Sequence, residues 1–250
     1  MGAGREGALE NLVTKFAVAL NADPEKLRDT YRSAKPFPHI VIDELFSDEV
    51  LERILKVFPA PEHAGWQTFD NVREKKLGNL GGLLEADETI AEFLIALNSP
   101  PTLAFLEKLT GIDGLIPDPY FGGGGLHQIV RGGFLKVHAD FNWHPKLKLD
   151  RRLNVLVYLN KGWKEDYGGH LELWDRDLKR AENCILPVFN RTVVFSTTDF
   201  SYHGHPRPLR CPESTTRKSI SLYYYSNGRP EEEKSAPHDT LFRETPETLE

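Results

Sequence analysis

The second half of the chain alternates short strand-like runs with turn-forming residues. Four runs rich in β-branched and aromatic residues stand at 153–160, 168–175, 191–197 and 218–226, and clusters of glycine, proline, asparagine and aspartate separate them. Short strands at this spacing are typical of a β-sandwich or barrel, in which each strand buries one face against a facing sheet. From about residue 118 onward we therefore expect a β core.

The first part of the chain predicts helices around one short strand. Ser47 is a good N-cap for the apolar stripe that follows it, and Gly111 is a typical residue at a helix end. The strand is expected at Ile40–Ile42, and helices are expected at 8–20, 47–58, 88–99 and 101–111. Helices followed by many short strands indicate an α+β protein.

A chain of 250 residues suits a single domain in three parts. We expect a mainly helical lead-in over residues 1–117, a β core over 118–226 and a polar, poorly ordered tail over 227–250. No internal repeat is visible, and the oligomeric state is not indicated.

Charge and composition exclude several classes of protein. The net charge of −6 disfavours a general nucleic-acid binder, and no apolar run approaches the length that crosses a bilayer. The first residues lack the basic and then apolar character of a secretory signal. With only Cys184 and Cys211, reduced thiols are the simpler expectation, so we expect a cytoplasmic protein without nucleic-acid or membrane partners.

Two sequence patterns match known motifs but lack their context. Residues 2–7 fit the dinucleotide pattern G-x-G-x-x-G, yet they follow no strand. The glycines at 122–125 precede no Gly-Lys-Ser/Thr, so we expect a tight turn beside a pocket. His39 and His63 are interpreted as packing or surface histidines.

His138 and Asp140 stand two residues apart in the strand-like run 132–144. Residues i and i+2 of a β-strand point to one face, so the imidazole and the carboxylate share a face, and the apolar residues between them lie on the other. A third candidate, His203, follows just beyond the run 191–197. Two histidines and a carboxylate on a β scaffold form the facial triad that binds Fe(II) in non-haem oxygenases.

Alternatives remain for each of these ligands. His138 and Asp140 alone would also fit an ordinary surface pair. His205 competes with His203, because the two share a face if the strand continues that far. Two histidines and an aspartate also suit zinc.

Arg217 and Ser219 share a face of the last strand-like run, and apolar residues occupy its other face. An arginine that points into a barrel is costly unless a carboxylate meets it, and its planar fork suits a bidentate carboxylate. The sequence therefore predicts a carboxylate anchor beyond the metal site.

Five motifs in this order resemble the Fe(II)/2-oxoglutarate dioxygenases of the prolyl 4-hydroxylase type. They are "HAD" (138–140), "LNVLVYLNKGW" (153–163), "GGHLELW" (168–174), "YHGHP" (202–206) and "TRKSISLYYY" (216–225). The resemblance covers about residues 118–226, and "PFPHIVIDELF" (36–46) is also similar to bacterial members. It implies a double-stranded β-helix, or jelly-roll, core with supporting N-terminal helices.

The resemblance also implies roles for individual residues. Iron would be bound by His138, Asp140 and His203, with His203 favoured over His205. Arg217 would hold the far carboxylate of 2-oxoglutarate, with Ser219 beside it. Further contacts to the cosubstrate would come from Tyr158, Gln128 and His127, in decreasing order of support.

The expected reaction is hydroxylation of an unactivated C–H of a prolyl, amino-acid or small-molecule substrate, with release of succinate and CO2. The cofactors would be Fe(II), 2-oxoglutarate and O2, with ascorbate left open. Collagen-type members often carry lysine where this chain has Arg217, a difference that bears on subgroup. Related halogenases replace the metal-binding carboxylate by a small residue, so Asp140 favours hydroxylation.

Two other functions remain open at this point. A zinc-dependent hydrolase would use the same three ligands but leaves Arg217 and Ser219 unexplained. A cupin-like metal-binding or sensing protein would bind a metal but would not catalyse the oxygenase reaction.

The substrate itself is not indicated by the sequence. Phe141 and Trp143 are expected to wall the pocket mouth. The segment 145–152 is interpreted as a solvated loop, with a basic lid over the substrate as the alternative. Its four basic residues hint at an acidic or carboxylate-bearing substrate: Lys146, Lys148, Arg151 and Arg152.

Overall fold

The computed structural model describes residues 18–78 and 87–246 of the chain. The helix expected over residues 8–20 lies almost entirely outside the described residues. Four α-helices are described: α2 (Pro24–Ser33), α3 (Asp48–Val57), α4 (Glu88–Leu97) and α5 (Pro100–Thr110). The last three confirm the helices expected from residue 47 onward.

Local caps explain where these helices begin and end. The Ser47 hydroxyl accepts the backbone N–H of Val50 at 3.4 Å at the start of α3, and the Asp87 carboxylate accepts that of Thr89 at 2.9 Å at the start of α4. Gly111 ends α5 with a φ of 75°, a left-handed conformation that glycine adopts without steric cost.

The strands form one antiparallel sheet that curls into two facing layers. Along its hydrogen-bonded path the order is β1-β11-β8-β13-β5-β3-β6-β12-β9-β10. The bounds are β1 (His39–Asp43), β2 (Gln67–Asp70), β3 (Glu74–Gly78), β4 (Ile116–Pro117), β5 (Gly125–Ile129), β6 (Phe134–Ala139), β7 (Trp143–His144), β8 (Leu149–Tyr158), β9 (Leu171–Trp174), β10 (Ala181–Ile185), β11 (Arg191–Ser196), β12 (His203–His205), β13 (Arg217–Ser226) and β14 (Leu241–Phe242).

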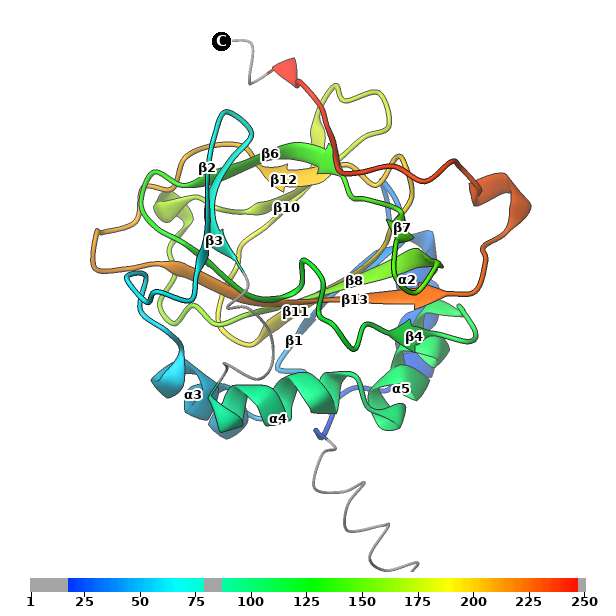
Figure 1. Cartoon of the computed structure of the whole chain (residues 1–250), viewed down its shortest axis with the longest axis horizontal. Helices are drawn as coiled ribbons and strands as arrows, with labels where there is room; N and C mark the ends of the chain where they lie inside the picture. Colours follow the sequence, from blue (N-terminus) through cyan, green and yellow to red (C-terminus); the bar gives the residue numbers. More distant parts are fainter. Residues whose placement is uncertain (1–17, 79–86, 247–250) are drawn as a thin grey trace, which may run out of the picture.

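Figure 1 shows β6, β12 and β10 facing a second layer that contains β13, β8, β11 and β1. This is the expected double-stranded β-helix. Strands β1, β2 and β3 lie in the predicted lead-in, and β3 links β5 to β6. The β core therefore extends beyond the expected segment 118–226.

The hydrophobic core lies between the helices and the outer face of the β8–β13 layer. Alternate residues of these strands, such as Val155, Val157, Ile220 and Leu222, pack there with residues from α3, α4 and α5. Figure 1 shows α3, α4 and α5 along this side of the sheet. Because side chains alternate along a strand, the intervening residues of β8 and β13 face the space between the two layers.

The tail expected to be poorly ordered is an ordered segment as far as residue 246, which corrects that prediction. Asn142 holds it through both ends of its amide: Nδ2 donates to Ser235 Oγ and Ala236 O at 2.8 and 3.0 Å, and Oδ1 accepts the N–H of His238. Strand β14 then pairs with β6. The polar composition of the tail did not reveal this order, because much of it comes from hydrogen bonds to Asn142 and from pairing with the backbone of β6.

Among the described residues, no single helix is long and apolar enough to span a membrane. Helices α4 and α5, which meet at a bend of 45°, reach the required length and composition only when taken together.

Candidate metal centre

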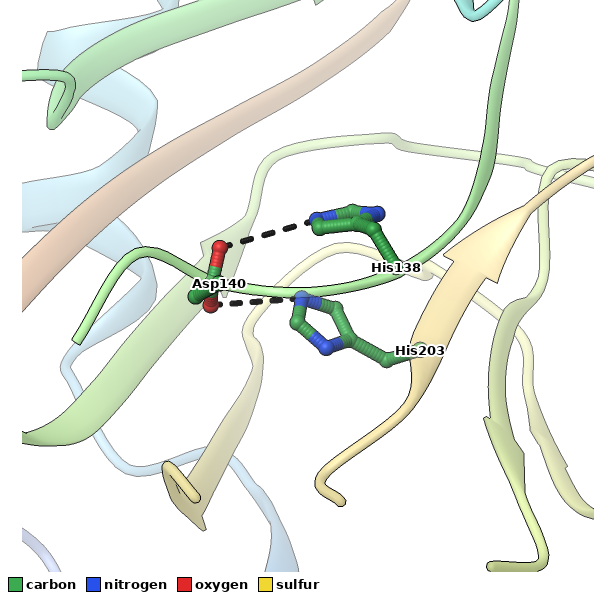
Figure 2. A group of neighbouring side chains, drawn as sticks. All are labelled: His138, Asp140 and His203. Carbon is green, nitrogen blue, oxygen red and sulfur yellow. Dashed lines mark ion pairs between the residues drawn. The ribbon is translucent and has the colours of Figure 1, made fainter. Parts of the chain in front are cut away.

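Three side chains converge between the two layers. His138 lies near the end of β6, Asp140 follows directly after it, and His203 begins β12, where it pairs with His138 across the sheet. The Nε2 atoms of both histidines lie 3.5 Å from Asp140, one from each carboxylate oxygen. Figure 2 shows the two rings directed at the two oxygens of the carboxylate. One ligand atom from each residue lies within 4.8 Å of the others, a spacing that could hold a metal ion.

Each imidazole is fixed in the orientation that a metal ligand requires. Nδ1 of His138 lies 2.8 Å from the carbonyl oxygen of Lys136, and Nδ1 of His203 lies 2.9 Å from that of Ser201. A carbonyl oxygen only accepts hydrogen bonds, so Nδ1 carries the proton in both rings. The lone pair of each Nε2 is thereby left on the side of Asp140. Burial lowers the pKa of His203 to about 4, which keeps its imidazole neutral and able to bind a metal.

Asp140 is held by two neighbours on β8. Nη2 of Arg151 donates to its Oδ2 at 3.0 Å, and the amide of Asn154 donates to the same oxygen at 2.7 Å. Burial by itself would raise the pKa of Asp140, but the positive charge of Arg151 opposes burial, and the pKa is held well below its ordinary value. Asp140 is therefore a carboxylate ready to coordinate a cation.

The position of Arg151 corrects the interpretation of 145–152 as a solvated loop or basic lid. Arg151 lies within β8 with 0% of its surface exposed, and its guanidinium stacks 3.5 Å from the centre of the Tyr223 ring. Arg152 is also buried and donates to Ser226 Oγ at 3.1 Å. With these two arginines engaged inside the protein, the hint of an acidic substrate rests on Lys146 and Lys148 alone.

Arg217 lies at the start of β13 and is only 5% exposed. Its Nε donates to the carbonyl oxygen of Gly169 at 2.8 Å, and its Nη2 lies 3.3 Å from the hydroxyl of Tyr158. No carboxylate of the described residues pairs with it. A side chain at Gly169 would approach Cδ of Arg217 to 3.0 Å, so glycine at this position lets the arginine lie against the backbone.

A cavity of about 280 Å³ joins these groups. The triad, Arg217, Ser219 and Tyr158 all line it, and so does Gly123 of the glycine-rich turn, as expected. Phe141 also lines the cavity, as predicted for the pocket mouth. Trp143 does not, because it belongs to β7 and pairs with Asp150 of β8 instead.

Comparison with known proteins finds a family whose sequence pattern includes these cavity residues. Residues 124–225 match the family model of the 2OG-Fe(II) oxygenase superfamily, a segment that includes the triad, Arg217 and Ser219. By this match, the segment that carries the candidate site is similar to the 2OG-Fe(II) oxygenase superfamily.

Individual relatives agree with this assignment. The prolyl 3-hydroxylase OGFOD1 of Mus musculus is 34% identical over 79 residues, which make up 30% of this chain and 14% of the mouse protein. The chain thus matches only a small part of that relative's length.

Two solved structures share the fold of this protein. A Pseudomonas putida prolyl 4-hydroxylase matches with a TM-score of 0.54 and 15% identity, covering 82% of this chain and 100% of that chain. A prolyl hydroxylase of Trichoplax adhaerens, in complex with a hypoxia-inducible-factor peptide fragment, matches with a TM-score of 0.57 and 19% identity over 81% and 90% of the two chains. At these identities the likeness shows the double-stranded β-helix alone.

The matched family is named for Fe(II) and 2-oxoglutarate, and the residues of this cavity fit both. Two imidazoles whose Nε2 atoms face one ionised carboxylate are the donor set that Fe(II) takes in a facial triad. Arg217 is a buried cation without a carboxylate partner in the described protein, at the other end of the same cavity. Its fork suits a carboxylate of the cosubstrate.

The register of β5 corrects the expected cosubstrate contact of Gln128. Gln128 pairs with Lys218, so it faces away from the cavity, where its amide donates to Thr216 Oγ1 at 2.7 Å. Its neighbour His127 pairs with Ser219 and lines the cavity of the oxygenase. The sequence indicated a polar contact from this part of β5. Only the pairing of β5 with β13 shows that His127, rather than Gln128, faces the cavity.

The choice between His203 and His205 is also resolved by geometry. Only His203 belongs to the group of mutually close ligand atoms. His205 lines the same cavity two residues further along β12 and is 4% exposed. Burial, and next the charge of Arg217, hold the pKa of His205 well below its ordinary value, so this imidazole is neutral.

Proposed function

We propose that this oxygenase hydroxylates a C–H bond of its substrate, with Fe(II) held by His138, Asp140 and His203 and with 2-oxoglutarate anchored by Arg217. One observation carries the proposal: a triad of metal-binding geometry and a buried, carboxylate-free arginine line a single cavity. When bound, Fe(II) and 2-oxoglutarate supply the oxidising chemistry, in which O2 is consumed and succinate and CO2 are released.

The protein residues position the reactants and exclude water. The two Nδ1–carbonyl hydrogen bonds and the Arg151–Asn154 pair keep the three ligands in place before any metal arrives. Arg217 would bind the distal carboxylate through its fork, with Tyr158 and Ser219 beside it. Aromatic side chains of the cavity, Phe69, Phe141 and Phe242, would shield the reaction from solvent.

For the substrate we propose a prolyl residue as the first class to test, ahead of a free amino acid or another small molecule. The mouse relative is named a prolyl 3-hydroxylase, and the aromatic and apolar cavity walls suit an apolar ring. The zinc-hydrolase and cupin-like alternatives give no role to a buried arginine that faces the metal site across a cavity.

The test is an anaerobic titration of the metal-free protein with Fe(II) and 2-oxoglutarate. We expect the visible absorption band that arises when a keto acid binds to protein-held Fe(II). Arg217→Ala should need at least 10-fold more 2-oxoglutarate to reach the same band, because a charge-assisted bidentate pair is lost. No band in well-folded wild-type protein would reject the oxygenase function and favour the two alternatives.

A further inference from the structure

His205 is a buried imidazole that the proposed reaction does not yet use. Its side chain is 4% exposed, and among the described residues neither Nδ1 nor Nε2 has a hydrogen-bond partner. It lines the cavity on the same face of β12 as His203, but it lies outside the metal-binding group. A buried polar group without a hydrogen-bond partner destabilises the folded protein. We therefore expect a bound ligand to supply the partner of His205.

The position of His205 relates it to Arg217 rather than to the metal site. His205 is two residues beyond His203, and two residues of a β-strand extend about 6.6 Å along the strand. The step leads away from Asp140, because His203 pairs with His138 but His205 pairs with Leu135, three residues earlier on β6. His205 therefore lies on the side of the cavity that points away from the metal ligands.

Strand β9 connects His205 with the anchor. In the pairing of β12 with β9, His203 lies opposite Leu173 and Gly204 lies opposite Glu172. In this antiparallel register, the residue of β9 level with His205 is Leu171. Gly169, two residues before Leu171, accepts the hydrogen bond from Nε of Arg217. Gly169 and His205 also border a second, smaller cavity behind the anchor. Arg217 and His205 thus approach one end of the main cavity from opposite layers of the sheet.

We propose that His205 donates a hydrogen bond to the distal carboxylate of 2-oxoglutarate, so that this carboxylate is held by Arg217 from one layer and by His205 from the other. An imidazole ring carries an N–H that can be donated, and a carboxylate bound by Arg217 keeps lone pairs that can accept it. This inference rests on the proposed function. It adds that the anchor is a pair of residues rather than an arginine alone.

The experiment compares 2-oxoglutarate with 2-oxopentanoate, a keto acid of the same length without the distal carboxylate. Both are titrated calorimetrically into the full chain loaded with Mn(II), for wild type and His205→Leu. We expect 2-oxoglutarate to bind roughly 10- to 100-fold more weakly to the variant, as for loss of a hydrogen bond to a charged group. The affinity for 2-oxopentanoate should not change.

Two further variants identify the donor atom. The side-chain amide nitrogen of glutamine can replace Nε2 of histidine, and that of asparagine can replace Nδ1. We expect one of His205→Gln and His205→Asn to recover most of the affinity for 2-oxoglutarate. His39→Leu, which removes a buried histidine outside the cavity, serves as the matched control and should leave the affinity for 2-oxoglutarate unchanged.

A purely structural role for His205 would give different results. Without ligands, the melting temperature of His205→Leu should equal or exceed that of wild type, because the histidine removed has no partner in the protein. A lower melting temperature together with unchanged 2-oxoglutarate affinity would overturn the inference, and so would equal weakening of both keto acids. Loss of Mn(II) binding in His205→Leu would make His205 a metal ligand instead.

The same titrations separate this inference from the proposed function. Wild-type protein that fails to bind 2-oxoglutarate at all would reject both. Wild-type protein that binds it, with a His205→Leu variant of equal affinity, would reject only the role of His205.

Discussion

The two ends of the cavity are built differently. At the metal end, Asp140 receives hydrogen bonds from Arg151 and Asn154, and its charge is balanced within the protein. At the anchor end, Arg217 is buried without a carboxylate partner, and neither ring nitrogen of His205 has a partner, within the part of the chain that the structure describes. The protein itself completes the metal end, whereas the anchor end is complete only when an anionic ligand is bound.

This difference shows which end is organised in advance. A ligand set fixed by neighbouring hydrogen bonds binds its metal without rearrangement. A buried charge without a partner lowers the stability of the unliganded protein, and the ligand that neutralises it stabilises the folded state. Substitutions at the two ends should therefore have opposite effects on the stability of the unliganded protein.

The largest effect is expected from Asp140→Ala. It removes the only carboxylate of the triad and leaves Arg151 buried without its partner. We expect Mn(II) binding, followed by calorimetry, and substrate-dependent succinate formation both to be lost. Asp140→Asn keeps the size and hydrogen bonding of the side chain and should fold better but remain inactive. Full activity in either folded variant would remove Asp140 from the ligand set.

Arg151→Met tests whether the protein organises the metal end. Breaking a buried ion pair leaves Asp140 as an uncompensated charge, and we expect a loss of about 3–5 kcal/mol in the free energy of unfolding. The affinity for Mn(II) should fall about 10- to 100-fold, the usual cost of losing a group that orients a ligand. Urea denaturation and calorimetry measure the two quantities. An unchanged metal affinity would show that Asn154 alone positions Asp140.

Arg217→Met is the matched substitution at the anchor end. Because Arg217 has no charged partner in the described protein, the unliganded variant should be as stable as wild type or more stable. Mn(II) with 2-oxoglutarate at 100 times its Kd should stabilise wild type by about 2.7 kcal/mol, and the same concentrations should stabilise the variant far less. A marked loss of stability without ligand would contradict the proposed contrast between the two ends.

The smallest effect is expected from Tyr158→Phe. The hydroxyl of Tyr158 lies 3.3 Å from Nη2 of Arg217, a long hydrogen bond. Its loss should weaken 2-oxoglutarate binding by about 10-fold or less and leave Mn(II) binding unchanged. A loss as large as that of Arg217→Ala would instead indicate that Tyr158 binds the cosubstrate directly.

Local patterns in the sequence predicted much of this structure. The alternation of apolar residues in 153–160 and 218–226 corresponds to the buried faces of β8 and β13. The spacing of His138 and Asp140 correctly predicted a shared face, because side-chain direction along a strand depends only on the backbone of that strand. The caps at Ser47 and Gly111 mark helix ends for the same local reason.

Contacts between distant segments accounted for the wrong predictions. Arg151 stands in a run of basic residues that is typical of a solvated loop, but Asp140, on another strand, makes its burial favourable. Residues 227–246 have the composition of a flexible tail, but Asn142 forms hydrogen bonds with Ser235, Ala236 and His238 within them. Gln128 and His127 are equally polar, and only pairing with β13 turns His127 inward.

The sequence by itself determined the helices from residue 47 onward, the main strands of the β core with their faces, and the chemical types of the ligands, because these depend on backbone geometry over a few residues. The tertiary structure decided which histidine of 203–205 joins Asp140, which arginine neutralises it, and which polar groups remain without partners. Those outcomes depend on the pairing of β6, β8, β12 and β13, which join residues far apart in the chain. Burial and charge balance arise only once these strands enclose a common cavity.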